Sequence, residues 1–378
     1  MARRRIRVLF DANPLLVQKT GVGHYTYRLI RALAGRDDLE LIGYYSGALG
    51  DAALPEGVSY HRLPVPKKII NQLRRMRLLP PIELLTGRRA DFLFFPDFLG
   101  LPSLFRTPRA CVIHDMTFLD LPEYVSRRNQ RDLARFVPRE VARSRFVVTV
   151  SEFSKQRLRE AYGLKAEGIL VTPIPPDNPL PADTKIDPET LQQLGIDGKY
   201  ILTLGTIEPR KNLVSMLETY VALPPQVREE YAFVVAGKVG WNCEAEIAKL
   251  QELKDAGYRI CQIGYVDDRQ RAVLYRYASL FTMASRYEGF GMQALEAMSY
   301  GTACAVSDIP VFREVSGDAA VYFEGGRPEA ITKAWLRLLQ DDAYRKELVS
   351  AGLQRVAGYD WSTVASSLHD RIIGSLGN

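Results

Sequence analysis

Two carboxylates stand on either side of a glycine-rich stretch in the second half of the chain. Glu288 and Glu296 belong to the segment SRYEGFGMQALEAMSYG at 285–301. The glycines leave the backbone bare, so that a ligand can approach it closely, and the helix that MQALEAM predicts would offer free amide groups to a phosphate. Carboxylates spaced in this way can accept hydrogen bonds from different hydroxyls of one extended ligand, such as a sugar ring and a ribose.

An adjacent pair of cations, Arg210 and Lys211, follows an apolar run in the segment LGTIEPRKNLVSMLETY at 204–220. Two fixed cations suit a diphosphate, and they can neutralise the charge that develops when a nucleoside diphosphate leaves. Taken alone, such a pair is more often the solvated start of a helix. Its position after a strand, like that of the glutamate segment downstream, favours the diphosphate interpretation.

His114 and Asp115 end an apolar run in the first half of the chain, RACVIHD at 109–115. A histidine placed there could donate a hydrogen bond to a sugar or order a second substrate, and the aspartate could orient either group. An isolated pair of this kind is more often structural. The functional interpretation therefore depends on the other motifs of the chain.

Short apolar runs alternate with helical patterns in both halves of the chain, which predicts buried parallel strands. In the first half the runs are IRVLFDA (6–12), LELIGYYS (39–46), DFLFFP (91–96), RACVIHD (109–115) and RFVVTVS (145–151). In the second half they are YILTLG (200–205), YAFVVAG (231–237), YRICQIG (258–264), LFTMAS (280–285), TACAVS (302–307) and AAVYF (319–323). Two successive doubly wound α/β domains follow, with ligands expected beyond the carboxyl ends of the strands.

A proline-rich segment, PIPPDNPLP at 173–181, separates the two series of strands. Its prolines remove backbone donors and forbid a regular helix. We predict an N-terminal domain at 1–176, a linker at 177–186 and a C-terminal domain at 187–360. The segment from Trp361 has helical spacing and predicts a helix at 361–378 that is capped by Ser362 and packs back on the N-terminal domain.

The composition is that of a globular protein with room for two cores, with 378 residues, 47% of them apolar and 25% charged. The four cysteines lie far apart and form no CxxC pair, which disfavours a disulfide framework or a zinc site. The basic amino terminus leads into a strand-like run without a signal-peptide core, and no stretch approaches the roughly 20 apolar residues of a spanning helix. We expect a protein of the reducing cytoplasm.

Basic and apolar residues are interleaved between Lys67 and Arg89. Such a mixture suits the surface of an anionic membrane, where apolar groups enter the interface and cations meet lipid phosphates. An ordinary helix with a solvated cationic face explains the pattern equally well. Nucleic acid is a weaker candidate, because no recognised nucleic-acid motif accompanies the basic region.

Together these segments resemble glycosyltransferase family 4, a family of retaining enzymes with the GT-B fold. The resemblance covers nearly the whole chain and rests on TGVGHY at 20–25, VIHD at 112–115, TVSEFSK at 149–155, GTIEPRKN at 205–212, GYV at 264–266 and the Glu288–Glu296 pair, which is similar to the family's E-x7-E motif. The family commonly has proline near the first glutamate and after GFG, where this chain has Met283, Ala284 and Gln293. These departures affect the shape of the sugar pocket more than the reaction class.

The resemblance implies a GT-B fold of two Rossmann-like domains that face each other across a cleft, the first binding an acceptor and the second a nucleotide sugar. Arg210 and Lys211 would bind the donor diphosphate, Glu288 the donor sugar and Glu296 the ribose. The implied catalytic positions are Arg210, Lys211, Glu288, His114 and Asp115. The implied donor-binding positions are Gly21, Val22, Gly23, Gly205, Arg210, Lys211, Val266, Glu288, Gly289, Phe290, Gly291, Met292 and Glu296.

No cofactor and no tightly bound metal are implied, because the nucleotide sugar is itself the substrate and the chain has no Asp-x-Asp metal motif. The segments TGVGHYTYRLIRAL and GTIEPRKNL resemble those of bacterial mannosyl- and rhamnosyltransferases of polysaccharide and O-antigen assembly. GDP-mannose or GDP-rhamnose is therefore the expected donor, and a glycan or a lipid-linked glycan the expected acceptor. A sugar-nucleotide epimerase of the same fold and a non-catalytic nucleotide-sugar binding subunit stay open as alternatives.

Overall fold

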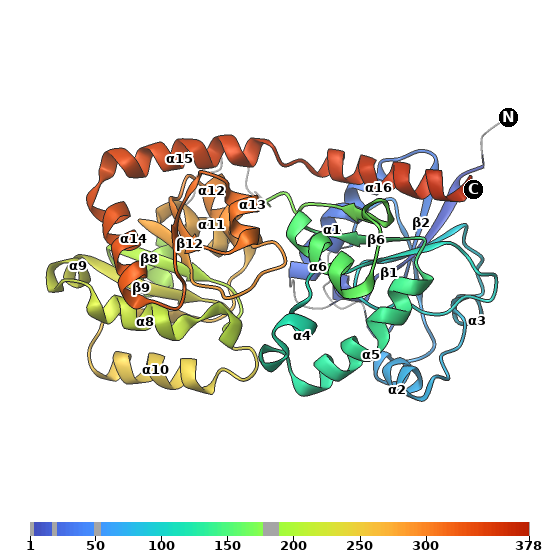
Figure 1. Ribbon diagram of the computed structural model, residues 1–378, viewed down its shortest axis with the longest axis horizontal. Coiled ribbons are helices and arrows are strands. Elements are labelled where there is room, and N and C mark those ends of the chain that lie inside the picture. Colours follow the sequence, from blue (N-terminus) through green and yellow to red (C-terminus); the bar gives the residue numbers. More distant parts are fainter. Residues whose placement is uncertain (1–3, 17–20, 49–53, 177–188, 378) are drawn as a thin grey trace. The chain divides into compact units, whose positions relative to one another are not determined.

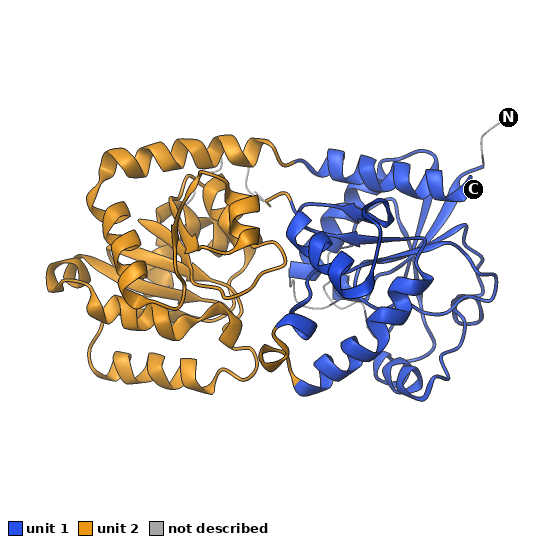
Figure 2. Ribbon diagram, viewed as in Figure 1, with its two compact units in different colours: residues 1–120, 127–174, 360–378 blue, residues 121–126, 175–359 orange. Residues whose placement is uncertain are grey.

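The computed structural model describes residues 4–16, 21–48, 54–176 and 189–377. The chain divides into two compact units, which Figure 2 distinguishes by colour. Unit 1 comprises residues 1–120, 127–174 and 360–378, and unit 2 comprises residues 121–126 and 175–359. The short segment 121–126, which the sequence analysis assigns to the N-terminal domain, is thus grouped with the second unit. The predicted linker at 177–186 lies outside the described residues.

Unit 1 is built on a parallel sheet, for which the described residues give seven strands in the order β3-β2-β1-β4-β5-β6-β7. The strands are β1 (Ile6–Asp11), β2 (Leu39–Tyr45), β3 (Ser59–Arg62), β4 (Phe92–Phe95), β5 (Arg109–Val112), β6 (Phe146–Thr149) and β7 (Ile169–Val171). Strands β4, β5 and β6 are buried throughout, because helices cover both faces of a parallel sheet.

Most helices of unit 1 lie between these strands along the chain, and α16 comes last (Figure 1). They are the 3-10 helices η1 (Asn13–Leu16) and η3 (Ala166–Gly168), and the α-helices α1 (Gly21–Ala34), α2 (Lys67–Met76), α3 (Ile82–Thr86), α4 (Thr117–Asp120), α5 (Arg127–Arg143), α6 (Glu152–Tyr162) and α16 (Trp361–Leu376). The 3-10 helix η2 (Pro122–Tyr124) falls in the segment that belongs to unit 2. Helix α16 packs against α1, and its Val364, Leu368 and Ile372 are buried there.

Unit 2 repeats the same architecture, with six described strands in the order β10-β9-β8-β11-β12-β13. They are β8 (Lys199–Leu204), β9 (Tyr231–Ala236), β10 (Ile260–Ile263), β11 (Leu280–Met283), β12 (Cys304–Ser307) and β13 (Ala320–Phe323). The core on one face joins Ile201 and Phe233 of the sheet to Leu217 of α8 and to Trp335 of α14. The indole of Trp335 also donates a hydrogen bond to Thr282 Oγ1 at 3.0 Å.

Apart from η2, the helices of unit 2 begin with α7, before the first strand, and the others lie between the strands or after the last one. They are α7 (Glu189–Gln193), the 3-10 helix η4 (Pro209–Lys211), α8 (Leu213–Ala222), α9 (Pro225–Glu230), α10 (Glu244–Asp255), α11 (Asp268–Tyr277), α12 (Met292–Ser299), α13 (Pro310–Ser316), α14 (Pro328–Gln340) and α15 (Asp342–Ala357). Helix α11 begins with a capping box, in which Asp267 accepts from the Gln270 amide at 2.8 Å and the Gln270 side chain accepts from the Asp267 amide at 3.0 Å.

The eleven apolar runs of the sequence all contain strands, whereas β3 and β7 were not predicted. Strand β3 has the polar sequence SYHR at one edge of its sheet, and β7 is three residues long at the other edge. The predicted cap of the last helix was also wrong. Asp360 rather than Ser362 caps α16, because its carboxylate accepts from the Thr363 amide at 2.8 Å and from the Ser362 hydroxyl.

The strand order creates a switch point in each sheet, where chain connections leave in opposite directions. It lies between β1 and β4 in unit 1 and between β8 and β11 in unit 2. In parallel sheets, ligands bind beyond the carboxyl ends of the strands at this point. The loops after β1, β4, β8 and β11 are therefore the first places to examine for chemistry.

One glycine supplies a test of how closely the loops after β8 and β9 must approach. Gly237, directly after β9, has φ 139°, and a Cβ atom there would overlap the carbonyl oxygen of Gly205. We expect Gly237→Ala to destabilise the protein by more than the roughly 1–2 kcal/mol that left-handed strain alone costs. Gly257→Ala is the control, because Gly257 has φ 81° but open space around it. Urea unfolding measures both, and equal losses would contradict the expectation.

Candidate active site

The two segments that the sequence analysis singled out meet at the switch point of unit 2. Arg210 and Lys211 lie in η4, the first helical element after β8. Glu288 lies in the loop between β11 and α12. Because β8 and β11 are hydrogen-bonded neighbours, their loops emerge side by side. The two loops are also tied directly, since the Arg286 amide donates to the Arg210 carbonyl oxygen at 2.9 Å.

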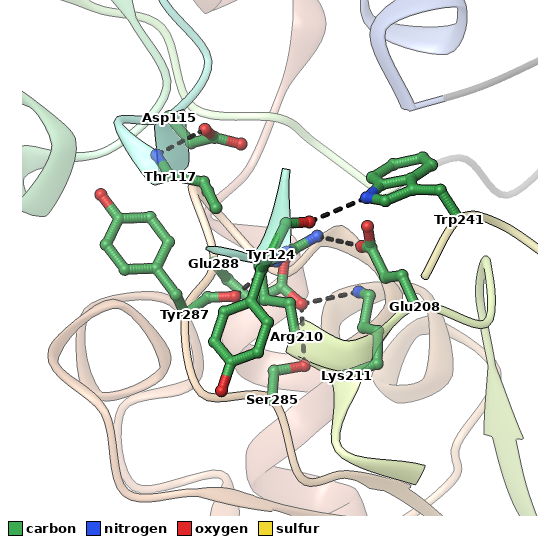
Figure 3. A network of polar contacts seen from close by, with 10 residues as sticks. All are labelled: Asp115, Thr117, Tyr124, Glu208, Arg210, Lys211, Trp241, Ser285, Tyr287 and Glu288. Atoms are coloured by element: carbon green, nitrogen blue, oxygen red, sulfur yellow. Dashed lines mark hydrogen bonds and ion pairs between the residues drawn. The ribbon is translucent and has the colours of Figure 1, made fainter. Parts of the chain in front are cut away.

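Glu288 sits between the two cations, as Figure 3 shows. Lys211 Nζ lies 2.6 Å from Glu288 Oε1, and Arg210 Nη1 lies 2.6 Å from Oε2. The Ser285 hydroxyl donates to Oε1 at 2.8 Å. With 7% of its side chain exposed, Glu288 is held on both oxygens in a largely buried position.

Arg210 has further partners besides Glu288. Its Nη2 lies 2.5 Å from Glu208 Oε1, and its Nη1 also donates to the Tyr287 carbonyl oxygen. The side chain of Glu208 is 6% exposed. The cluster therefore contains two cations and two carboxylates, and its net charge is zero. Sequence analysis predicted the cations and one carboxylate, but not Glu208.

The charges around Glu288 control its ionisation. Burial alone would raise the pKa of Glu288, but Arg210 and Lys211, through their charges and hydrogen bonds, lower it to about 2. The carboxylate is therefore ionised at neutral pH. An ionised Glu288 accepts hydrogen bonds, as a contact with sugar hydroxyls requires, and cannot donate them.

Helix α12 begins next to this cluster. Gly291 is its N-cap, with φ 85°, a left-handed conformation that favours glycine. The sequence from Gly289 to Met292 therefore brings a helix amino terminus, with its free amides, to the switch point. Phe290 is buried and packs edge-on against Tyr359 at 6.1 Å between ring centroids, which anchors the loop.

Glu296 lies one turn inside α12, as the sequence predicts, but its carboxylate is enclosed by α11. The side chain accepts a hydrogen bond from the Tyr275 hydroxyl at 2.9 Å, and Arg271 Nη1 lies 3.8 Å from its other oxygen. Only 1% of the residue is exposed. The ribose contact of Glu296 stays a prediction, and it requires the ribose to reach the carboxylate beside Arg271.

His114 and Asp115 follow β5 in unit 1, and both are engaged within that unit. His114 Nε2 lies 2.8 Å from the Pro96 carbonyl oxygen, and the ring packs edge-on against Tyr25 at 5.1 Å. Burial lowers the pKa of His114 in spite of that bond. A neutral ring that donates through Nε2 keeps Nδ1 as an acceptor, whereas the sequence analysis expected a donor. Asp115 accepts from the Thr117 amide, at the start of α4, at 2.9 Å.

The remaining predicted donor-binding residues are spread over three loops. Gly21, Val22 and Gly23 form the first turn of α1, as the sequence predicts. Gly205 follows β8, and its Cα region lies against Lys211 and Gln293. Val266 lies in the loop between β10 and α11, at the same carboxyl edge of the sheet. Their contacts with a donor stay predictions.

Sequence analysis missed residues that hold the cluster in shape. Asn212 joins η4 to α8 with φ 55°, its side chain donates to the Gly325 carbonyl oxygen, and its Oδ1 accepts from the Ser215 hydroxyl at 2.9 Å. Glu208 and Ser285 belong to the same group of supporting residues. The available signal was their position, since each lies at or after the end of a predicted strand and within a few residues of a nominated side chain.

Unit 1 has a polar pocket at its own switch point. The pocket has a volume of about 380 Å³ and extends from β1 to α5. Its lining includes Asp11 at the end of β1, Asn13, Lys67, Arg74 and Asp97. Side chains of this kind can donate to and accept from several hydroxyl groups at once.

In the described part of the chain, no group of three or more histidine, cysteine, aspartate or glutamate side chains could hold a metal ion. No helix among the described residues is both long and apolar enough to cross a membrane.

Comparisons with known proteins agree with this geometry. Residues 187–355 match the family described as "Glycosyl transferases group 1", and residues 19–176 match "Glycosyltransferase Family 4". The O-antigen chain mannosyltransferase B of Escherichia coli is 30% identical over 94% of this chain and 96% of that protein. A phosphatidyl-myo-inositol mannosyltransferase of Mycobacterium leprae is 33% identical over 45% of each chain. Anabaena HepE, solved with UDP and glucose, has a TM-score of 0.75 at 16% identity and covers 98% of this chain and 100% of its own.

Two parallel-sheet units and a largely buried cluster of two cations and two carboxylates at a switch point, together with these matches, define a glycosyltransferase with the GT-B fold. The chain belongs to glycosyltransferase family 4. The predicted family and the predicted two-domain α/β fold are confirmed, and so is the predicted enzyme class, a hexosyltransferase similar to mannosyltransferases.

The pKa of Glu288 generates a test of the cluster. A carboxylate whose pKa falls from 4.5 to about 2 on folding contributes stability above pH 4.5 and loses it as the pH falls toward 2. A shift of this size corresponds to about 3 kcal/mol. We expect the difference in unfolding free energy between wild type and Glu288→Gln to shrink by that order over this pH range. Urea titrations measure it, with Glu229→Gln on the exposed end of α9 as the control; a difference that does not change with pH would contradict the ion pairs.

Proposed function

We propose that this enzyme transfers a mannosyl residue from GDP-mannose to a hydroxyl of a glycan or lipid-linked glycan in polysaccharide or O-antigen assembly. The proposal is supported by the O-antigen mannosyltransferase that is 30% identical over 94% of the chain. A phosphatidyl-myo-inositol mannosyltransferase among the relatives also favours mannose. GDP-rhamnose is the second candidate donor, because it is a deoxyhexose nucleotide of the same base.

The observation that carries the proposal is the contact of Arg210 and Lys211 with Glu288 at the switch point of unit 2. Lys211 has three donor protons and Arg210 has five, so each can keep Glu288 as a partner and still bind phosphate oxygens. Glu288 would then be oriented by the same cations that hold the diphosphate. A sugar hydroxyl bound to Glu288 would lie beside the bond that breaks.

The chemical step that fits this arrangement is loss of a nucleoside diphosphate from the anomeric carbon. Negative charge grows on the phosphate oxygens as the bond breaks, and preorganised cations in a site of low solvent exposure stabilise it without rearranging. We propose that retention of configuration follows, with the donor phosphate taking the proton of the attacking hydroxyl. Arg210, Lys211 and the amides at the start of α12 carry the electrostatic role, and no resident metal ion or other cofactor takes part in the proposal.

We assign the acceptor to unit 1. The pocket at the β1–β4 switch point presents Asp11, Asn13 and Asp97, which together can bind several hydroxyls of a saccharide. Burial raises the pKa of Asp11, and its carboxylate accepts from the Asn13 amide at 2.9 Å. His114, with Nδ1 as an acceptor, is proposed to order a hydroxyl near this region.

We also propose a peripheral contact with the inner face of the cytoplasmic membrane, through the region from Lys67 to Arg89. Helix α2 exposes Ile69 and Met76, and Leu78 and Leu84 beyond it are 61% and 69% exposed. Large exposed apolar side chains among cations match the interfacial pattern that the sequence indicated. The enzyme would then work in the cytoplasm, where nucleotide sugars are available, on an acceptor held at the membrane.

Lys211→Ala tests the role of the cluster. We expect the rate of mannosyl transfer to fall by about 100-fold or more, because removing one preorganised donor to a developing charge costs about 2.7–4 kcal/mol. The fold should persist, since Arg210 still compensates Glu288. Lys254→Ala, an exposed change on α10, is the control. Transfer rates are compared with melting temperatures, and normal turnover by a folded Lys211→Ala protein would reject the role of Lys211.

Donor identity and stereochemistry need a separate experiment. We expect GDP-mannose to raise the melting temperature more than GDP-rhamnose or UDP-glucose, because a bound ligand stabilises the folded state by mass action. The product formed from an α-linked donor should carry an α-linked mannose by NMR. A preference for a UDP-sugar would overturn the proposed donor, and a β-linked product would overturn retention. Conversion of the donor to another nucleotide sugar without acceptor would identify an epimerase, and donor binding without any turnover a binding subunit.

A further inference from the structure

A second pocket of unit 1 has four arginines among the ten residues that line it. It lies between the end of α2, the loop at 99–102 and the second half of α5, and its volume is about 280 Å³. The charged residues of its wall are Arg74, Arg77, Arg139, Arg143 and Glu140. We call it the arginine pocket. It shares no residue with the donor cluster of unit 2.

The positive charge of the arginine pocket is not balanced from within. Glu140, the carboxylate of its wall, is buried and lies 3.6 Å from Arg109, which is a separate arginine behind the wall. For the side chains of Arg77, Arg139 and Arg143, the described residues supply no hydrogen-bond or ion-pair partner. Like charges gathered around one pocket repel each other, so an anion that enters it is stabilised by all of them.

Two arginines of the wall differ in their local environments. Arg74 Nη1 donates to the Gly100 carbonyl oxygen at 2.7 Å, while its buried Nε has no hydrogen-bond partner among the described residues. Arg77 ends α2 in a left-handed conformation, with φ 62°, and its amide donates to the Arg74 carbonyl oxygen at 3.1 Å. Glycine is the residue that this position favours, and an arginine there costs about 1 kcal/mol. The side chain of Arg77 therefore has no local structural reason to be there.

We propose that the arginine pocket binds a phosphate or diphosphate group, carried either by a soluble molecule or by a lipid headgroup. Planar guanidinium groups match the oxygens of phosphate in pairs, which lysines do not. The wall also contains apolar side chains, Leu79 and Phe136, and the neighbouring Met76 and Leu78 are 57% and 61% exposed. A headgroup phosphate in the pocket would place its apolar chains next to these residues.

Arg74 connects this pocket to the one at the switch point of unit 1, because it lines both. A ligand that carries a phosphate next to a saccharide could therefore occupy the two pockets together. This last link rests on the proposed assignment of the acceptor to unit 1. The phosphate site itself does not, because it depends only on the arginines.

The test compares pocket variants with a control that has the same change of charge. Arg139→Gln/Arg143→Gln removes two cations four residues apart on α5, and Arg127→Gln/Arg131→Gln removes two exposed cations with the same spacing outside the pocket. Arg77→Gly removes a third cation and relieves a left-handed arginine, so it should melt at or above the wild-type temperature. Binding of inorganic pyrophosphate is measured by calorimetry at low salt, and binding to phosphatidylcholine vesicles with and without phosphatidic acid by sedimentation.

We expect both pocket variants to weaken pocket-dependent binding by about tenfold or more, as the loss of charged hydrogen bonds requires, and the control to leave it unchanged. Loss of pyrophosphate binding alone identifies a soluble phosphate ligand. Loss of binding to phosphatidic acid vesicles, with or without loss of pyrophosphate binding, identifies a headgroup. If the pocket variants behave like the control with both probes, or if the control loses as much as they do, the proposal is overturned. Donor-induced stabilisation, measured on the same proteins, reports separately on unit 2.

Discussion

The ion pairs that Glu288 makes with Arg210 and Lys211 constrain the whole switch point of unit 2. An ionised carboxylate with 7% of its side chain exposed is tolerated only if its charge is matched, because leaving one buried partner alone costs about 3–5 kcal/mol. Glu208 extends the same requirement to the far side of Arg210. The loops after β8 and β11 must therefore stay together. Under the proposed function, a site that carries no net charge of its own accepts a diphosphate, because a lysine has three donor protons and an arginine has five.

The two units place different chemistry on the same strand order. In unit 2 the switch point holds opposite charges packed against each other. In unit 1 it holds a wider polar pocket, with the arginine pocket next to it through Arg74. The contrast fits a division in which one unit stabilises a leaving group and the other holds a second substrate by its hydroxyls and its charge. The fold supplies the position, and the loop residues supply the chemistry.

Sequence reasoning succeeded where one physical cause dominated. Strands such as β4 and β9 were predictable because parallel strands covered on both faces must be apolar throughout. The convergence of Lys211 and Glu288 was predictable because both follow strands whose carboxyl ends share an edge. The family resemblance then supplied roles that spacing alone could not.

What the sequence could not reveal depends on neighbours that are distant along the chain. The Tyr275 hydroxyl that covers Glu296, and the Pro96 carbonyl oxygen that engages His114, belong to other elements. Strand β3 lies at the edge of its sheet and has a polar sequence, so no apolar run marks it as a strand. The choice between Ser362 and Asp360 as the cap of α16 was local, but two suitable residues stood two positions apart, and the carboxylate accepts more bonds.

Helix α16 belongs to unit 1 although the whole of unit 2 precedes it in the chain. Tyr25 of α1 contacts Trp361, and Arg36, just after α1, donates to Ser366 at 2.5 Å, so the last described helix covers part of α1. During synthesis, the α1 surface of unit 1 stays uncovered until the residues around 376 have left the ribosome. All residues of unit 2 are available for folding earlier. Unit 1 is thus the first to begin synthesis and the last to be completed.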